Sequence, residues 1–112
     1  MIVQNGDRRP RDLQPGVLHT VLAYSDDLML CEVCFEEGIS LAEHSHPHQQ
    51  AMYVVEGSVE LSLGSEKRVL AAGDSCSIAA DLAHGVKALT KARVLDVFTP
   101  ARQDFYPFAP AR

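Results

Sequence analysis

Hydrophobic and polar residues alternate along several short stretches of the chain. The alternation is clearest in Val59–Leu63, where every second side chain is apolar. Successive side chains of a strand point to opposite faces, so this pattern is typical of a sheet with one buried face. Such stretches predict strands at Val17–Tyr24, Leu28–Glu37, Gln50–Glu56, Val59–Leu63, Lys67–Ala72, Ser75–Ala80, Gly85–Leu89 and Ala92–Thr99. Short strands at this spacing predict an all-β sandwich or barrel.

The segments between these stretches carry residues that favour turns. Glycine accepts positive φ angles, and Asp or Ser side chains bond nearby backbone groups. The expected turns are Ser25–Asp27, Glu56–Ser58, Gly64–Glu66 and Ala72–Asp74. No long helical stretch is present, although Asp81–His84 could form one short turn.

The length of 112 residues leaves room for one domain. We expect an N-terminal arm at residues 1–16, a barrel at residues 17–100 and a C-terminal tail at residues 101–112. The tail places Phe105, Tyr106 and Phe108 among prolines, so it cannot continue a central strand. Its aromatic side chains are expected to pack on the barrel exterior or on a partner subunit.

Composition and charge exclude several classes of protein. The hydrophobic share of 46% and charged share of 22% are ordinary for a globular protein, which argues against disorder, collagen and coiled coil. A net charge of −5 argues against a general nucleic-acid binder. No apolar run is long enough for a membrane helix, and Met1–Arg11 lacks the apolar centre of a signal peptide. We therefore expect a cytoplasmic protein with neither nucleic acid nor membrane as a partner.

The three cysteines include a Cys-x-x-Cys pair, Cys31 and Cys34, that could suggest redox chemistry or a zinc site. Residues three apart on a strand point to opposite faces, so these two thiols should diverge. There is also no second pair to complete a zinc site. We expect Cys31, Cys34 and Cys76 to be reduced structural residues, with at least one of them buried.

Four of the five histidines are candidates for chemistry. His44 and His46 lie two apart, so on an extended strand they would project from one face and could bind one ion together with the distant His84. His48 follows Pro47, and a role beside the ligands or at the surface is expected for it. Neutral imidazole suits divalent transition metals better than Mg²⁺.

A wider window gives Gly38-x5-His44-x-His46-x3-Gln50-x6-Gly57, followed by Gly73-x10-His84. The first pattern resembles the first signature motif of the cupin superfamily in every spacing. The second motif retains only its glycine and histidine. The resemblance implies a cupin double-stranded β-helix, a small jelly-roll barrel, with one metal bound by His44, His46, His84 and the residue at position 50.

Position 50 carries Gln where the general cupin motif has a carboxylate. An amide oxygen brings no charge, so the metal would keep its full positive charge and favour an anionic substrate. Ni, Zn, Fe and Mn are the candidate metals.

Several segments also resemble pectin-degradation cupins of the KdgF type. They are Leu22–Met29, Glu32–Gly38, His44–Gly57, His84–Val86 and Leu95–Phe105. In that family the metal is held by His, His, Gln and His, and the catalytic Asp, Phe and Arg fall on Asp96, Phe98 and Arg102. The resemblance implies ring opening of 4,5-unsaturated monouronates, released from pectin or alginate by lyases, to linear keto acids.

The residues themselves agree with that implication. Asp96 and Phe98 are two apart on a predicted strand and share one face, where an aspartate is costly unless it is paired, protonated or used. Arg102 follows the strand and could meet a carboxylate at the barrel mouth. Asp96 is the candidate for proton transfer, Arg102 for orienting substrate or assisting that transfer, and Phe98 for shaping the sugar wall. The structural alternative is an Asp96–Arg102 ion pair with Phe98 in the core.

Two other functions remain open from the sequence. One is an Fe(II)-dependent cupin dioxygenase, and the other is a non-catalytic metal- or sugar-binding module. No Gly-x-Ser-x-Gly motif suggests a triad hydrolase. The expected partner is a small anionic sugar acid. A homodimer is also expected, with the N-terminal arm and aromatic tail suited to contacts across a two-fold interface.

Overall fold

Ten antiparallel strands and two short 3-10 helices make up the computed structural model, which describes residues 1–112. The elements are η1 Asn5–Asp7, β1 Arg11–Gln14, β2 Val17–Tyr24, β3 Met29–Phe35, β4 Ser40–His44, β5 Gln49–Glu56, β6 Ser58–Leu63, β7 Glu66–Ala71, β8 Ser75–Ile78, β9 His84–Ala88, β10 Ala92–Thr99 and η2 Gln103–Phe108. The all-β expectation is confirmed. No helix is long and apolar enough to cross a membrane.

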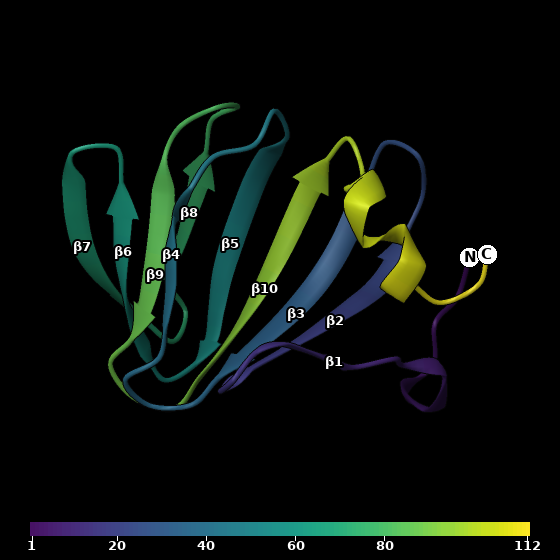
Figure 1. Ribbon diagram of the computed structural model, residues 1–112, viewed down its shortest axis with the longest axis horizontal. Coiled ribbons are helices and arrows are strands. Elements are labelled where there is room, and N and C mark those ends of the chain that lie inside the picture. The colour runs from purple at the N-terminus through teal and green to yellow at the C-terminus, as the bar shows by residue number, and fades with distance from the viewer.

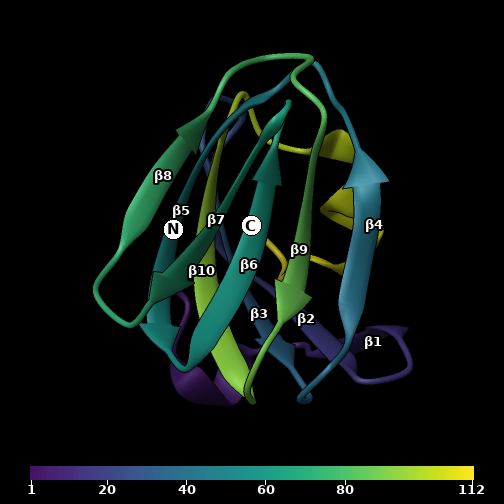
Figure 2. The ribbon, with the colours of Figure 1, turned by 90° about the vertical axis from the view of Figure 1, so that its left-hand side faces the viewer.

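The strands form two sheets that face each other (Figures 1 and 2). The larger sheet has the order β1-β2-β3-β10-β5-β8 and the smaller one β4-β9-β6-β7. The last strand, β10, therefore lies in the middle of the larger sheet, between β3 and β5. Its register sets Phe98 opposite Gln50 and Asp96 opposite Met52. This pairing brings residues from the middle and from the end of the barrel sequence to one place.

Alternating side chains from both sheets fill the barrel. In β10, Ala92, Val94, Asp96 and Phe98 are all buried, while the residues between them are only half-buried. One apolar cluster lies between the sheets and contains Val33, Phe35, Met52, Val54, Val59, Leu61 and Val94, among others. Each such side chain contributes about 1.5–3 kcal/mol when it is fully buried. This packed core fixes the strands that carry the polar residues of the site.

Most predicted strands agree with the observed ones within a few residues, and Val17–Tyr24 and Ala92–Thr99 have the predicted bounds. Strand β4 was not predicted, because Ser40–His44 is mostly exposed and shows no buried alternation. The N-terminal segment also differs from the predicted arm, because its residues Arg11–Gln14 form β1 and pair with β2 as the edge strand of the larger sheet. Asp81–His84 forms no helix, and Asp81 lies in a turn instead.

The cysteines behave as expected. All three are free. Cys31 is fully buried in the barrel. Cys34 lies on the outer face of the same sheet, where its sulfur is 3.8 Å from a carboxylate oxygen of Glu32 on that face. The Cys-x-x-Cys pair thus points in two directions and holds no common ligand.

The C-terminal tail packs on its own chain. Arg9 donates a hydrogen bond of 2.7 Å to the carbonyl of Ala109, and Arg112 pairs with Asp26 at 2.7 Å. The two termini lie side by side in Figure 1. Phe105 does not pack on the barrel exterior as expected, because its ring contacts Phe98 and lines the barrel cavity. The tail therefore completes one wall of that cavity.

Candidate metal centre and active-site cavity

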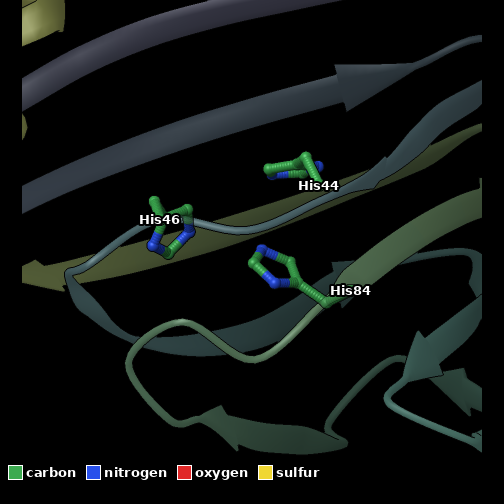
Figure 3. Close-up of side chains that lie close together, drawn as sticks. All are labelled: His44, His46 and His84. Atoms are coloured by element: carbon green, nitrogen blue, oxygen red, sulfur yellow. The ribbon is translucent and has the colours of Figure 1, made fainter.

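Three histidines meet between the two sheets (Figure 3). His44 ends β4 and is the register partner of His84, which begins β9. His46 lies in the segment after β4, so the expectation that it shares a strand with His44 is wrong. Even so, one ligand atom from each ring lies within 4.8 Å of the others, a grouping that could hold a metal ion.

Hydrogen bonds to the backbone fix the tautomer of all three rings. Nδ1 of His44 and of His84 bonds the carbonyl two residues earlier, at 2.9 and 2.8 Å. Nδ1 of His46 bonds the carbonyl two residues later, at 3.0 Å. A carbonyl oxygen only accepts, so each Nδ1 carries the proton and each Nε2 keeps a lone pair. The protein has therefore prepared three nitrogen ligands.

Within the protein, polar atoms of the histidine cluster lack suitable partners. Nε2 of His84 is buried and has no hydrogen-bond partner. Nε2 of His46 lies 3.1 Å from Oε1 of Gln50, which places two lone pairs opposite each other. A cation bound by all of these atoms removes both conflicts. The three imidazoles and the neutral oxygen thus fit a divalent transition metal.

The orientation of Gln50 is set by its other amide atom. Nε2 of Gln50 donates a hydrogen bond of 2.9 Å to Oδ1 of Asp96, and both side chains are buried. The amide nitrogen is therefore held toward Asp96 and the amide oxygen toward the histidines. Burial also lowers the pKa of His84, against the opposing effect of its backbone hydrogen bond, and favours the neutral ring that a metal needs.

A cavity of about 350 Å³ opens beside the cluster. Its polar lining includes His44, His84, Gln50, Asp96 and Arg102. Apolar side chains from both sheets form most of the remaining wall. A concave, largely apolar site with a few converging polar groups is typical of small-molecule binding.

Asp96 lies in the centre of the larger sheet and shares the inward face with Phe98, as expected. Burial raises the pKa of Asp96 to about 6, although the Gln50 hydrogen bond and the charge of Arg102 act in the opposite direction. Phe98 is buried, and its ring meets that of His46 edge to face at a centroid distance of 5.6 Å. Asp96 is therefore connected to the histidine cluster through Gln50, and Phe98 contacts it directly.

Arg102 does not form the ion pair with Asp96 that was the structural alternative. Its Nε and one terminal nitrogen donate to the carboxylate of Asp104, at 3.0 and 2.8 Å. The guanidinium carbon lies 4.3 Å from the centroid of Phe105 and 5.1 Å from that of Phe98. Arg102 thus lines the cavity with donors left over, at the position the sequence suggested for binding an anion.

His48 lies outside the cluster. Its carbonyl accepts the His46 hydrogen bond, and its half-buried ring faces Phe98 at a centroid distance of 6.5 Å. This position agrees with a role beside the ligands.

The cavity residues that were not predicted include His19 from β2 and Phe105 from the tail. His19 occupies an inward position between Val17 and Val21, and a polar residue within that apolar alternation was the available signal.

The chain is similar to known proteins in sequence and in structure. The Cupin domain family matches residues 31–98. The pectin degradation protein KdgF of Dickeya dadantii (strain 3937) is 38% identical over 96 residues, which cover 84% of this chain and 87% of that protein.

Two solved structures are also similar over nearly the whole chain. KdgF from Halomonas sp. superposes with a TM-score of 0.89 at 34% identity, covering 94% of this chain and 97% of that one. An RmlC-like cupin from Shewanella frigidimarina gives a TM-score of 0.89 at 31% identity, covering 93% and 94%. The chain therefore belongs to the cupin family and, within it, to the KdgF family.

Proposed function

We propose that this chain is a metal-dependent enzyme that converts 4,5-unsaturated monouronates from pectin or alginate breakdown into linear 4-deoxy-5-keto uronates. The observation that carries the proposal is the Gln50–Asp96 hydrogen bond of 2.9 Å, which joins the histidine cluster to a buried carboxylate within one cavity. The relatives named KdgF, one of them described as a pectin degradation protein, support the substrate class.

The chemistry of such a substrate defines what the site must do. The ring oxygen belongs to a hemiacetal at C1 and to an enol ether at C5, next to the C6 carboxylate. Removal of the C1 hydroxyl proton forms the C1 carbonyl and breaks the bond between C1 and the ring oxygen. The released electron pair remains on that oxygen as an enolate, and protonation at C4 gives the C5 ketone. The reaction is an isomerisation that needs neither oxidant nor reductant.

Asp96 is the proposed proton carrier. Its Oδ1 is occupied by Gln50, which leaves the second carboxylate oxygen for exchange with substrate. In this role it takes the C1 hydroxyl proton and supplies a proton at C4. Arg102 orients the substrate carboxylate with its remaining donors, and Phe98 forms an apolar wall against the sugar ring.

The metal would be held by His44, His46, His84 and the amide oxygen of Gln50. Once bound, Ni, Zn, Fe or Mn in the divalent state supplies Lewis-acid stabilisation of negative charge on oxygen. The protein contributes the fixed tautomers described above, and the neutral Gln50 leaves the metal charge available for an anionic ligand.

The test is an ultraviolet assay of unsaturated galacturonate under nitrogen, with metal-loaded protein, chelator-treated protein and a protein-free control. We expect the absorbance of the conjugated double bond to fall faster than in the control only when metal is bound. Turnover that requires O₂ would indicate a dioxygenase instead. Binding of the sugar acid without turnover would indicate a binding module.

We also propose that the protein is a homodimer formed through the outer face of the larger sheet. Leu95 lies between Tyr53 and Glu32 in register on that face, and Val97 lies beside Leu30. Tyr53 is 47% exposed there. Light scattering after gel filtration should give twice the chain mass, and Leu95→Glu should give monomers.

The three free thiols suit a reducing compartment, which supports a cytoplasmic location.

A further inference from the structure

His19 lies in the wall of the cavity that β2 provides. It sits in the middle of that strand, opposite Arg11 of β1 and Val33 of β3. Its side chain is only 3% exposed, yet it lines the same cavity as Asp96. It is absent from the metal-binding group of three histidines. The role of His19 must therefore be sought elsewhere in the cavity.

The imidazole of His19 is not satisfied by the protein. Its Nδ1 is buried and has no hydrogen-bond partner. The nearest aromatic contact is an edge-on approach to Phe105, with centroids 4.7 Å apart, which packs the ring but does not pair the nitrogen. A buried polar atom without a partner is unfavourable, so a residue with only a packing role would be better served by an apolar ring.

The surroundings of His19 also keep its ring neutral. Burial, together with the positive charges of Arg11 and Arg102, lowers the pKa of His19 to about 4, against the opposing charge of Asp104. A neutral imidazole offers one donor and one acceptor, and both suit a hydroxyl group. The carboxylate of a sugar acid is better matched by the cationic groups elsewhere in the cavity.

We infer that His19 is a specificity-determining residue that hydrogen-bonds a ring hydroxyl of the bound sugar acid. The inference rests on the proposed function for the identity of the ligand. In this binding mode the anionic end of the ligand lies near Arg102 and the histidine cluster, and a hydroxyl-bearing edge lies against β2. Phe105 holds the imidazole in place by packing against it.

The test compares two variants and two ligands by calorimetric titration of the metal-loaded protein. His19→Phe keeps an aromatic ring against Phe105 and removes both nitrogens. Thr20→Val is the matched control, because Thr20 is the next residue of the strand, is equally buried and belongs to the other face. The ligands are D-galacturonate and tetrahydropyran-2-carboxylate, which has the ring oxygen and carboxylate but no hydroxyls.

We expect His19→Phe to weaken galacturonate binding about tenfold and to leave tetrahydropyran-2-carboxylate binding unchanged, while Thr20→Val changes neither. The melting temperature of His19→Phe should stay the same or rise, because an unpaired polar atom is removed. His19→Asn, with an amide close to the position of Nδ1, should recover part of the affinity for galacturonate.

An equal loss of affinity for both ligands in His19→Phe, or no loss of affinity for either, would overturn the inference. It is separable from the proposed function. If the wild type binds galacturonate through His19 but does not turn over the unsaturated sugar, the inference stands and the proposed function fails. If turnover occurs and His19→Phe leaves KM unchanged, the inference alone fails. A wild type that binds neither ligand contradicts the inference.

Discussion

The side-chain amide of Gln50 donates to Asp96 at 2.9 Å while its oxygen lies 3.1 Å from Nε2 of His46. One neutral side chain therefore connects the histidine cluster to the buried carboxylate. Strand pairing makes this possible, because Gln50 of β5 is in register with Phe98 of β10, two residues beyond Asp96. A carboxylate at position 50 could still bind a metal, but it could not donate to Asp96.

This relationship predicts the effect of Gln50→Glu. The new carboxylate would face Asp96 across a hydrogen-bond distance, remove the donor and raise the pKa of Asp96 by repulsion between like charges. We expect the metal to bind as tightly as before or more tightly, while kcat falls at least about tenfold. Gln49→Glu is the control, since it adds the same charge at an exposed neighbouring position. Unchanged kcat in Gln50→Glu would contradict this role of the amide.

Asp96→Asn tests the proton carrier. The Asn oxygen can still accept the hydrogen bond from Gln50, so Gln50 and the histidine cluster should keep their geometry. We expect kcat to fall by about 10²–10⁴-fold, with metal content by mass spectrometry and the circular dichroism spectrum unchanged. Loss of metal or of fold in this variant would favour a structural role for Asp96.

The stability of the metal-free protein should depend on pH through His19. The unfolded chain takes up the proton near pH 6.5, whereas the folded chain does so only at about pH 4, because burial and the charges of Arg11 and Arg102 outweigh Asp104. Acidification through this window therefore favours the unfolded state, by about 3 kcal/mol at most. The free energy of urea unfolding of the wild type, minus that of His19→Phe, should fall by this amount between about pH 7 and pH 4, because the opposite contribution of Asp96, whose pKa burial raises to about 6, is common to both proteins. Equal losses in both proteins would contradict the assignment.

Gly57 should be among the glycines least tolerant of substitution. Its φ of +77° favours glycine, and an added Cβ would lie 2.1 Å from the carbonyl oxygen of Lys91. Gly38 has a similar φ of +83° but nothing within 4 Å of the added atom. We expect Gly38→Ala to cost about 1 kcal/mol from the backbone alone, and Gly57→Ala to cost at least about 2 kcal/mol more. Similar melting temperatures for the two variants would argue against the close contact.

The sequence predicted the strands best where apolar residues alternate across a sheet with a buried face. Val17–Tyr24 and Ala92–Thr99 are such strands. Ser40–His44 was missed because it is a mostly exposed edge strand, paired only with β9 on one side. No local pattern marks such a strand, since its position depends on a partner forty or more residues away in the sequence.

The sequence analysis named the polar residues that meet in the candidate site, but it did not predict how they are arranged. The spacing of His44 and His46 suggested one strand face, whereas the strand ends at His44 and the rings meet because β4 pairs with β9. Arg102 was placed correctly in the cavity, but its pairing with Asp104 depends on the turn into η2. Phe105 was expected outside the barrel, because the sequence of the tail does not reveal the direction in which it folds back.

The most direct measurement is NMR spectroscopy of the product formed from 4,5-unsaturated galacturonate in D₂O under nitrogen. Protonation by a fixed group in the cavity should place deuterium in one of the two diastereotopic positions at C4, at a rate above the protein-free control and only with metal bound. Deuterium spread equally over both positions at the control rate, with metal bound, would contradict catalysis of this ring opening.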